Sequence, residues 1–249
     1  MTELASGAAE AAPSSPSVAA VCSRPLHDGQ LRPYKARALT RGEFKKLDVY
    51  RFYSCKEGRP VDVVGPFQLA YRLQLEFSPD ITAIVERPRK LQFSDSSLEL
   101  NFWWRKTSGR EHFALLVPDA DTLPGPDKHR RPRQKERLLN AAGSAGIDLE
   151  LVTEEQVQQK RARTELYFQL LGFVQSAKNL KSDLILRQEV LAVNSQFARI
   201  TVEHLETDLA QYPRLHIHIV VAELIYLGAI ATDATARLLR SSLIWRTTS

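Results

Sequence analysis

The sequence predicts an α/β domain over residues 34–162 followed by an all-α domain over residues 163–249. Two observations lead to this division. Strand-like alternation of apolar and polar residues is frequent up to about residue 152, whereas helical spacing dominates from Leu166 onwards. Residues 1–33 are rich in Ala, Ser and Pro and hold almost no large apolar side chains, so we expect a disordered tail there.

The elements of the first domain follow from local signals. Residues 67–77 place apolar side chains at helical spacing, and Pro79 predicts the end of that helix. Residues 40–54 suggest one amphipathic element. Strands are expected at residues 81–88, 90–93, 97–106, 113–117 and 147–152, with a helix at 134–146 that ends at a glycine. These elements make a meander of at least three strands, followed by a helix and one more strand.

The helix that leads out of the first domain begins with a capping box, in which the Thr153 hydroxyl and the Gln156 side chain satisfy free amides at a helix start. Helices are expected at residues 157–177, 184–193, 201–210 and 215–228, and a wing or hairpin is expected at Leu238–Trp245. Three helices and a terminal ribbon are typical of a winged helix-turn-helix; a plain helical bundle with a tail is the alternative.

Composition restricts the class of protein. A chain of 249 residues with 43% hydrophobic residues has a folding composition. The two cysteines, Cys22 and Cys55, do not support a disulfide framework, which favours a cytoplasmic location. The longest apolar stretch, about residues 217–230, is shorter than a membrane span and is interrupted by His218 and Glu223, so no membrane association is expected.

Clustered positive charge points to nucleic acid. The net charge is +5, and residues 129–137 hold six basic side chains against the single acid Glu136. A second basic group lies in residues 85–90. Solvated loops are the alternative for both. The candidate phosphate contacts are Arg87, Arg89, Lys90, Arg130, Arg131, Arg133 and Lys135.

The run Phe113–Val117 breaks at a proline and is followed by Asp119 and Asp121. It is either the acid-tipped strand of a metal-dependent active site or a buried strand that ends in a polar turn. A separate candidate metal pair, His216 and His218, is not expected to bind a metal ion, because a spacing of two in a helix does not place both side chains on one face.

The order of these features resembles the TnsA-type endonuclease subunit of heteromeric transposases over about Tyr50 to Thr247. The resemblance rests on residues 54–93, a Trp-bearing strand, the LLVP stretch, a helix, GIDLELVTEEQV and the ending from Ala222 to Thr247. It implies a restriction-endonuclease-like first domain and a winged-helix-like second domain. The partners that it implies are DNA at transposon ends, a DDE-type transposase subunit and an AAA+ transposition regulator.

The resemblance also identifies the positions of a nuclease site. The family carries a glutamate on the first helix, an aspartate opening the second core strand, and a Gln-x-Lys or Glu-x-Lys pair on the next strand, which suit Mg²⁺ and phosphodiester hydrolysis. The matching positions here are Gln68, Asn101, Leu115 and Val117, and none of them is ionisable.

We therefore expect a catalytically inactive subunit without a cofactor, in which Phe113–Val117 is a core strand. One alternative is an active Mg²⁺-dependent endonuclease with ligands relocated to Glu76, Glu99, Glu111 or Asp119. Another is a winged-helix DNA-binding regulator.

Overall fold

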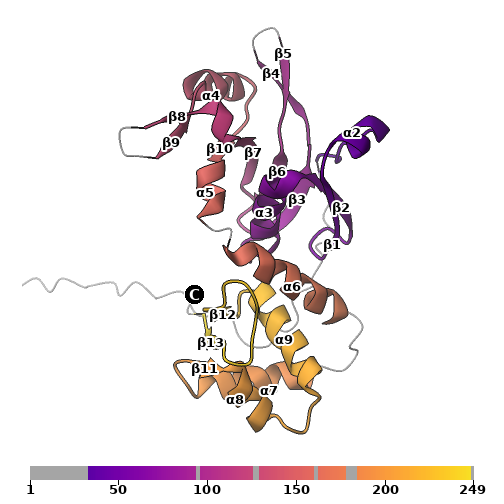
Figure 1. The fold of residues 1–249 in the computed structure, drawn as a ribbon, viewed down its shortest axis with the longest axis vertical. Helices are drawn as coiled ribbons and strands as arrows, with labels where there is room; N and C mark the ends of the chain where they lie inside the picture. Colours follow the sequence, from indigo (N-terminus) through magenta and orange to yellow (C-terminus); the bar gives the residue numbers. More distant parts are fainter. Residues whose placement is uncertain (1–32, 94–95, 126–128, 160–161, 178–183, 248–249) are drawn as a thin grey trace, which may run out of the picture.

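The computed structural model describes residues 33–93, 96–125, 129–159, 162–177 and 184–247. The predicted tail lies outside these residues, apart from residue 33. Figure 1 shows two lobes along the long axis of the molecule: one holds the main sheet, the other holds α7, α8, α9 and a small sheet, and α6 crosses between them.

The main sheet has the strand order β10-β7-β6-β3. Its strands are β3 (Ile81–Glu86), β6 (Phe102–Lys106), β7 (Glu111–Val117) and β10 (Leu149–Thr153). The first three form the predicted antiparallel meander, and β10 runs parallel to β7 after the crossover helix α4 (Lys135–Ser144). The predicted α/β character of this region is confirmed.

The two faces of the sheet are covered by different helices. Helix α3 (Gly65–Glu76) packs on the face that carries Phe102, Ala114 and Leu116, whereas α4 packs on the face that carries Leu115 and Val117. Alternate residues of each strand therefore enter different apolar clusters.

Three hairpins surround the sheet. They pair β1 (Val49–Ser54) with β2 (Arg59–Val64), β4 (Lys90–Phe93) with β5 (Ser96–Glu99), and β8 (Thr122–Pro124) with β9 (Arg130–Pro132). The prediction of a single amphipathic element at residues 40–54 is wrong. Helix α2 (Arg41–Lys46) is capped by Leu47, and strand β1 follows. The strand expected at residues 97–106 is interrupted at Leu100 and Asn101, so its two parts belong to different sheets.

Beyond β10, the described residues form five helices and the strands of a small sheet. The elements are α5 (Glu154–Gln158), α6 (Ala162–Ala177), α7 (Leu184–Ser195), β11 (Ile200–Thr201), α8 (Val202–Asp208), α9 (Arg214–Tyr226), β12 (Ile230–Thr232) and β13 (Leu243–Arg246). The capping box at Thr153 is confirmed, but the helix expected at 157–177 is divided into α5 and α6. The small sheet has the order β11-β13-β12, and the predicted terminal ribbon belongs to the β12–β13 hairpin.

The two lobes share one apolar core. Phe77 at the end of α3 stacks on Tyr167 of α6 with ring centres 4.6 Å apart. The Tyr226 hydroxyl of α9 donates to Glu76 Oε1 at 3.0 Å. The chain changes from mixed to helical structure near residue 163, but the hydrophobic cluster continues across that boundary. The two-domain division stays a prediction.

Helices within the described ranges are too short or too polar to cross a bilayer.

Candidate functional site

The strand at the proposed nuclease position is apolar. Leu115 and Val117 are 7% and 5% exposed, and they pack in one cluster with Leu138 and Ala142 of α4. Neither side chain offers an oxygen or an amine that could bind a metal ion, and packing in the cluster leaves both side chains little contact with solvent. The apolar environment predicted for this strand is therefore confirmed.

The two polar side chains among the four matched positions accept hydrogen bonds from backbone amides. Asn101 Oδ1 accepts from the Leu116 amide at 2.7 Å, and Gln68 Oε1 accepts from the Val64 amide at 3.4 Å. Gln68 belongs to α3, on the opposite side of the sheet from Leu115. The structure therefore does not bring the four matched positions together in one cluster.

The carboxylates considered as relocated ligands also have partners within the chain. Glu99 binds Arg37, with Nη2 to Oε2 at 2.7 Å, and Glu111 accepts from the Trp103 indole at 3.1 Å. The main-chain oxygen of Asp119 accepts from Arg130, and its side chain lies 3.5 Å from the same guanidinium. No group of three or more His, Cys, Asp or Glu side chains that could hold a metal ion occurs in the described ranges.

Glu76, the fourth of these carboxylates, forms the centre of a buried network. It and Arg72 are fully buried and form an ion pair at 2.7 Å, and Ser54 Oγ, the Lys56 amide and the Tyr226 hydroxyl also donate to it. Burial alone would raise the pKa of Glu76, but the Arg72 charge and these hydrogen bonds outweigh it and hold the pKa below its usual value. Its contacts come from both lobes, so this carboxylate stabilises their junction.

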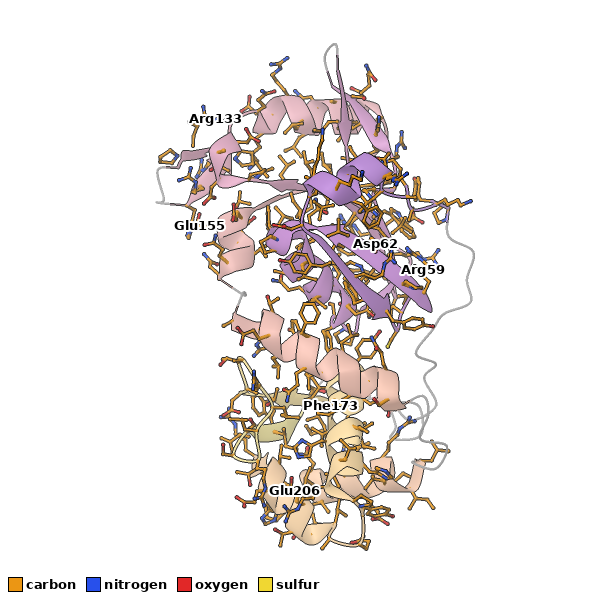
Figure 2. The ribbon with its side chains drawn as sticks, turned by 45° about the vertical axis from the view of Figure 1, so that its right-hand side comes forward. Arg59, Asp62, Arg133, Glu155, Phe173 and Glu206 are labelled. Atoms are coloured by element: carbon orange, nitrogen blue, oxygen red, sulfur yellow. The ribbon has the colours of Figure 1, made fainter. Side chains whose placement is uncertain are left out.

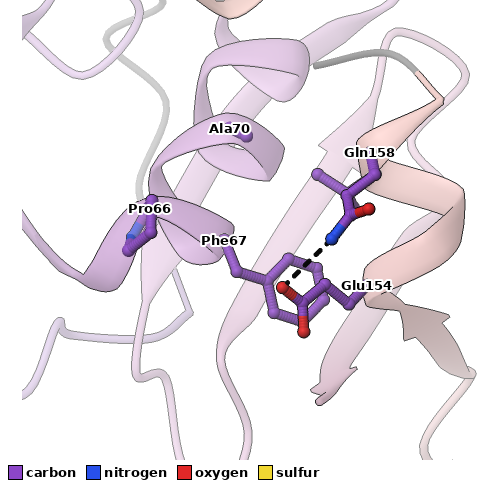
Figure 3. A pocket seen from close by; sticks show the side chains of 6 residues that line it. Pro66, Phe67, Ala70, Glu154 and Gln158 are labelled. Carbon is purple, nitrogen blue, oxygen red and sulfur yellow. Dashed lines mark hydrogen bonds between the residues drawn. The ribbon is translucent and has the colours of Figure 1, made fainter. Parts of the chain in front are cut away.

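A small cavity lies between the start of α3 and α5 (Figure 3). Its volume is about 40 Å³, close to that of one water molecule. Its two polar side chains bond to each other, with Gln158 Nε2 donating to Glu154 Oε1 at 3.3 Å. Glu154 directly follows β10 and was not predicted to be a site residue. Thr153 and Gln156 already identified this stretch as the start of a helix. The cavity is too small for a nucleotide. It is lined by Pro66, Phe67, Ala70, Glu154, Val157 and Gln158.

Two of the predicted phosphate contacts have structural roles. Arg87 is 6% exposed and donates from Nε to the Arg37 oxygen and from Nη1 to the Asp62 oxygen, both at 2.9 Å. Arg87 is therefore poorly placed to contact phosphates, because its side chain is buried and two of its donors are bonded within the chain. Arg130 donates to Thr122 Oγ1 and to the Asp119 oxygen, which ties β9 to the preceding loop.

The remaining basic residues are exposed around α4. Arg131, Arg133 and Lys135 lie on β9 and at the start of α4, and Arg133 extends from the outer edge of the upper lobe in Figure 2. Arg89 and Lys90, also exposed, lie at the start of β4, which packs beside α4. The structure thus brings the two basic clusters of the sequence next to the same helix. We call Arg89, Lys90, Arg131, Arg133 and Lys135 the α4 basic surface.

In the second lobe, the helix that would enter a DNA groove is covered. In a helix-turn-helix made by α8 and α9, the second helix would be the reading helix. However, α6 packs along α9, and the α9 residues from Ile217 to Tyr226 are buried or half-buried. Only its first turn, with Arg214 and Leu215, is open. His218 accordingly has a structural role, since its Nε2 lies 2.8 Å from Glu206 Oε1.

Comparison with known proteins gives no further assignment: no protein-family model matches the chain, and no curated protein matches it significantly.

Proposed function

We propose that the chain is a TnsA-like subunit that acts in DNA transposition by binding DNA and partner subunits without cutting DNA itself. The observation that carries the proposal is the packing of Leu115 and Val117 against α4. At these two positions the resemblance expects a carboxylate or amide and a lysine, which would bind Mg²⁺ and stabilise charge at the reacting phosphate. An apolar pair sealed by a helix supplies neither.

The order of the elements supports a restriction-endonuclease-like first domain. The resemblance places its site on a first helix, on the start of the second core strand and on the strand that follows. Helix α3 and strands β6 and β7 occur in this order, and the two strands belong to one mixed sheet that α3 covers. Since the fold and its chemistry are separable, this architecture is compatible with a subunit that has lost the site.

The second lobe supports a winged-helix-like unit used mainly for protein contacts. Its β12–β13 hairpin follows the helices α8 and α9, and β11, which precedes them, completes the small sheet. Because α9 is buried along most of its length, it is poorly suited to base reading, which disfavours the alternative of a winged-helix transcriptional regulator. The transposase subunit and the AAA+ regulator implied by the resemblance are the partners that we assign to this lobe.

DNA would bind to the α4 basic surface. Its Arg and Lys side chains are solvent-exposed, and phosphate contacts of this kind provide affinity without sequence preference. The test is duplex binding as a function of salt. Replacing both Arg133 and Lys135 with Ala should lower the slope against log salt by about 1.8, at ~0.9 for each phosphate contact. A matched Arg163→Ala variant removes an exposed charge from α6 and should leave the slope unchanged.

The lost activity has its own test. Purified protein incubated with Mg²⁺ or Mn²⁺ and the ends of its cognate element should produce no nicks above the level seen in chelator. Divalent-dependent nicking that disappears on Glu154→Gln or Asp119→Asn would replace the proposal with an active nuclease.

A further inference from the structure

An arginine lies over a tryptophan ring on the outer face of the small sheet. The guanidinium carbon of Arg199 is 4.7 Å from the centre of the Trp245 ring. Arg199 precedes β11, and the antiparallel register of β11 with β13 places it opposite Trp245. Their neighbours Ile200 and Ile244 are 5% and 0% exposed, so these two isoleucines face the core. Because side chains alternate along a strand, Arg199 and Trp245 face outwards.

Further groups of the same kind lie beside this pair. Phe197, two residues before Arg199, is 42% exposed, and its ring meets that of His204 edge-on with centres 5.0 Å apart. Within the part of the chain that the structure describes, Arg199 forms no ion pair. We call Phe197, Arg199 and Trp245 the aromatic–arginine face.

This combination suits a ligand that offers both flat rings and negative charge. Single-stranded nucleic acid does so, because its unpaired bases stack on aromatic side chains while its phosphates bind arginine. A guanidinium can stack on a ring and still direct its N–H groups at phosphate oxygens. Duplex DNA buries its base faces and would use only the arginine. Arg199, which has no carboxylate partner among the described residues, favours a polyanion over an apolar protein segment.

We infer that the aromatic–arginine face binds single-stranded nucleic acid by stacking and charge. This site differs from the α4 basic surface in its location and in the strand state that it takes, and it does not depend on the proposed role in transposition.

Tryptophan fluorescence of the full chain provides a direct readout. The chain has three tryptophans, and Trp103 and Trp104 are 0% and 7% exposed, so Trp245 is the one that a ligand can reach. Titration with an oligothymidylate of about 12 nucleotides should quench this emission, whereas a duplex of equal length should not. Trp245→Ala should weaken oligothymidylate binding, followed by anisotropy of a labelled strand, by roughly 5- to 150-fold.

Two matched pairs of variants separate this face from general charge and hydrophobicity. Arg199→Ala should weaken binding strongly, and Arg163→Ala, which removes an exposed arginine from α6, should not. Phe197→Ala should likewise weaken oligothymidylate binding more than Phe168→Ala does. Phe168 is a matched control, because Phe197 and Phe168 are 42% and 41% exposed. Trp245→Phe keeps a stacking ring and should retain most of the affinity for oligothymidylate. If Trp245→Ala melts at a lower temperature than wild type, Trp245→Phe separates the loss of stacking from the loss of folding.

Equal effects within either matched pair, or unchanged binding in a folded Trp245→Ala variant, would overturn the inference. The inference would also be overturned if these variants lost partner-protein binding but kept oligothymidylate binding. The face would then be a protein interface. Duplex binding through Arg133 and Lys135 is measured separately, so failure here leaves the proposed function standing.

Discussion

The two faces of the main sheet differ in what they bury. The face under α3 includes a full ion pair, Glu76 with Arg72, and its apolar cluster continues into the second lobe. The face under α4 is apolar, contains Leu115 and Val117, and ends within the first lobe. A fully buried ion pair therefore lies where the two lobes meet, and only packing lies where the resemblance expects catalysis. A buried carboxylate beside a mixed sheet is thus not sufficient to indicate a catalytic site.

The strongest test of this contrast restores the expected residues on the α4 face. Leu115→Glu combined with Val117→Lys would bury two charges among Leu138 and Ala142, with a cost of more than about 4 kcal/mol in unfolding free energy. We expect a protein that is largely unfolded by circular dichroism and does not bind Mg²⁺ by calorimetry.

The matched control changes the two polar positions. Gln68→Glu and Asn101→Asp keep the acceptor oxygens used by Val64 and Leu116, so this double variant should stay folded. It too should lack a micromolar Mg²⁺ or Mn²⁺ site, as should the wild-type chain. Folded protein with a bound metal in the Leu115→Glu, Val117→Lys variant would show that the α4 face is a dormant site.

On the α3 face, the expected loss comes from breaking the ion pair. Arg72→Leu leaves the buried Glu76 without its cation and should lower the unfolding free energy by about 3–5 kcal/mol in urea titrations. Arg51→Leu is the matched control, because Arg51 pairs with Asp62 at 2.7 Å but is 64% exposed. Its effect should be much smaller than that of Arg72→Leu, because an exposed ion pair contributes little to stability. Equal losses would mean that burial does not distinguish the two pairs.

A glycine at the lobe junction tests how tightly the α3 side is closed. Gly228 has φ of +74°, and a methyl group there would lie 2.6 Å from Cβ and Cγ of Pro79. Gly228→Ala should therefore lower stability by about 2–4 kcal/mol through backbone strain and overlap. Gly109 has φ of +82° but no neighbour within 4 Å, so Gly109→Ala measures the strain alone. Similar melting temperatures for both variants would indicate that the lobes separate easily.

The smallest expected effect is on pH dependence. The folded-state pKa of Glu76 lies below the ordinary 4.5, so its contribution is fully present above about pH 4.5 and is lost as pH falls through the folded pKa. In Arg72→Leu, burial without the cation should raise that pKa instead. The stability gap between wild type and Arg72→Leu should thus narrow from about pH 7 to about pH 3 in urea titrations. A constant gap would mean that the Arg72 contribution is not electrostatic.

Features that depend on neighbouring residues could be predicted. The capping box at Thr153 needs only Gln156, and the helix before Pro79 follows from its own apolar spacing, so both occur within a few residues of their expected positions. The division of residues 40–54 into α2 and β1 was missed, although Thr40 and Glu43 form a capping box that could have indicated it. The apolar character of α9 was also visible, and a helix that is hydrophobic on all sides is a buried one.

By itself, the sequence determined the alternation of strands and helices, the apolar residues at the two positions where the resemblance expects a catalytic pair, and the presence of two basic clusters. Only the tertiary structure decided that Arg87 is buried while Arg133 is exposed, that Gln68 and Leu115 lie on opposite sides of the sheet, and that Tyr226 bonds Glu76. The physical reason is the separation along the sequence over which each interaction acts. Capping and periodicity act between residues a few positions apart, whereas burial and side-chain pairing depend on segments far apart in the chain that meet only after the sheet and its helices have packed.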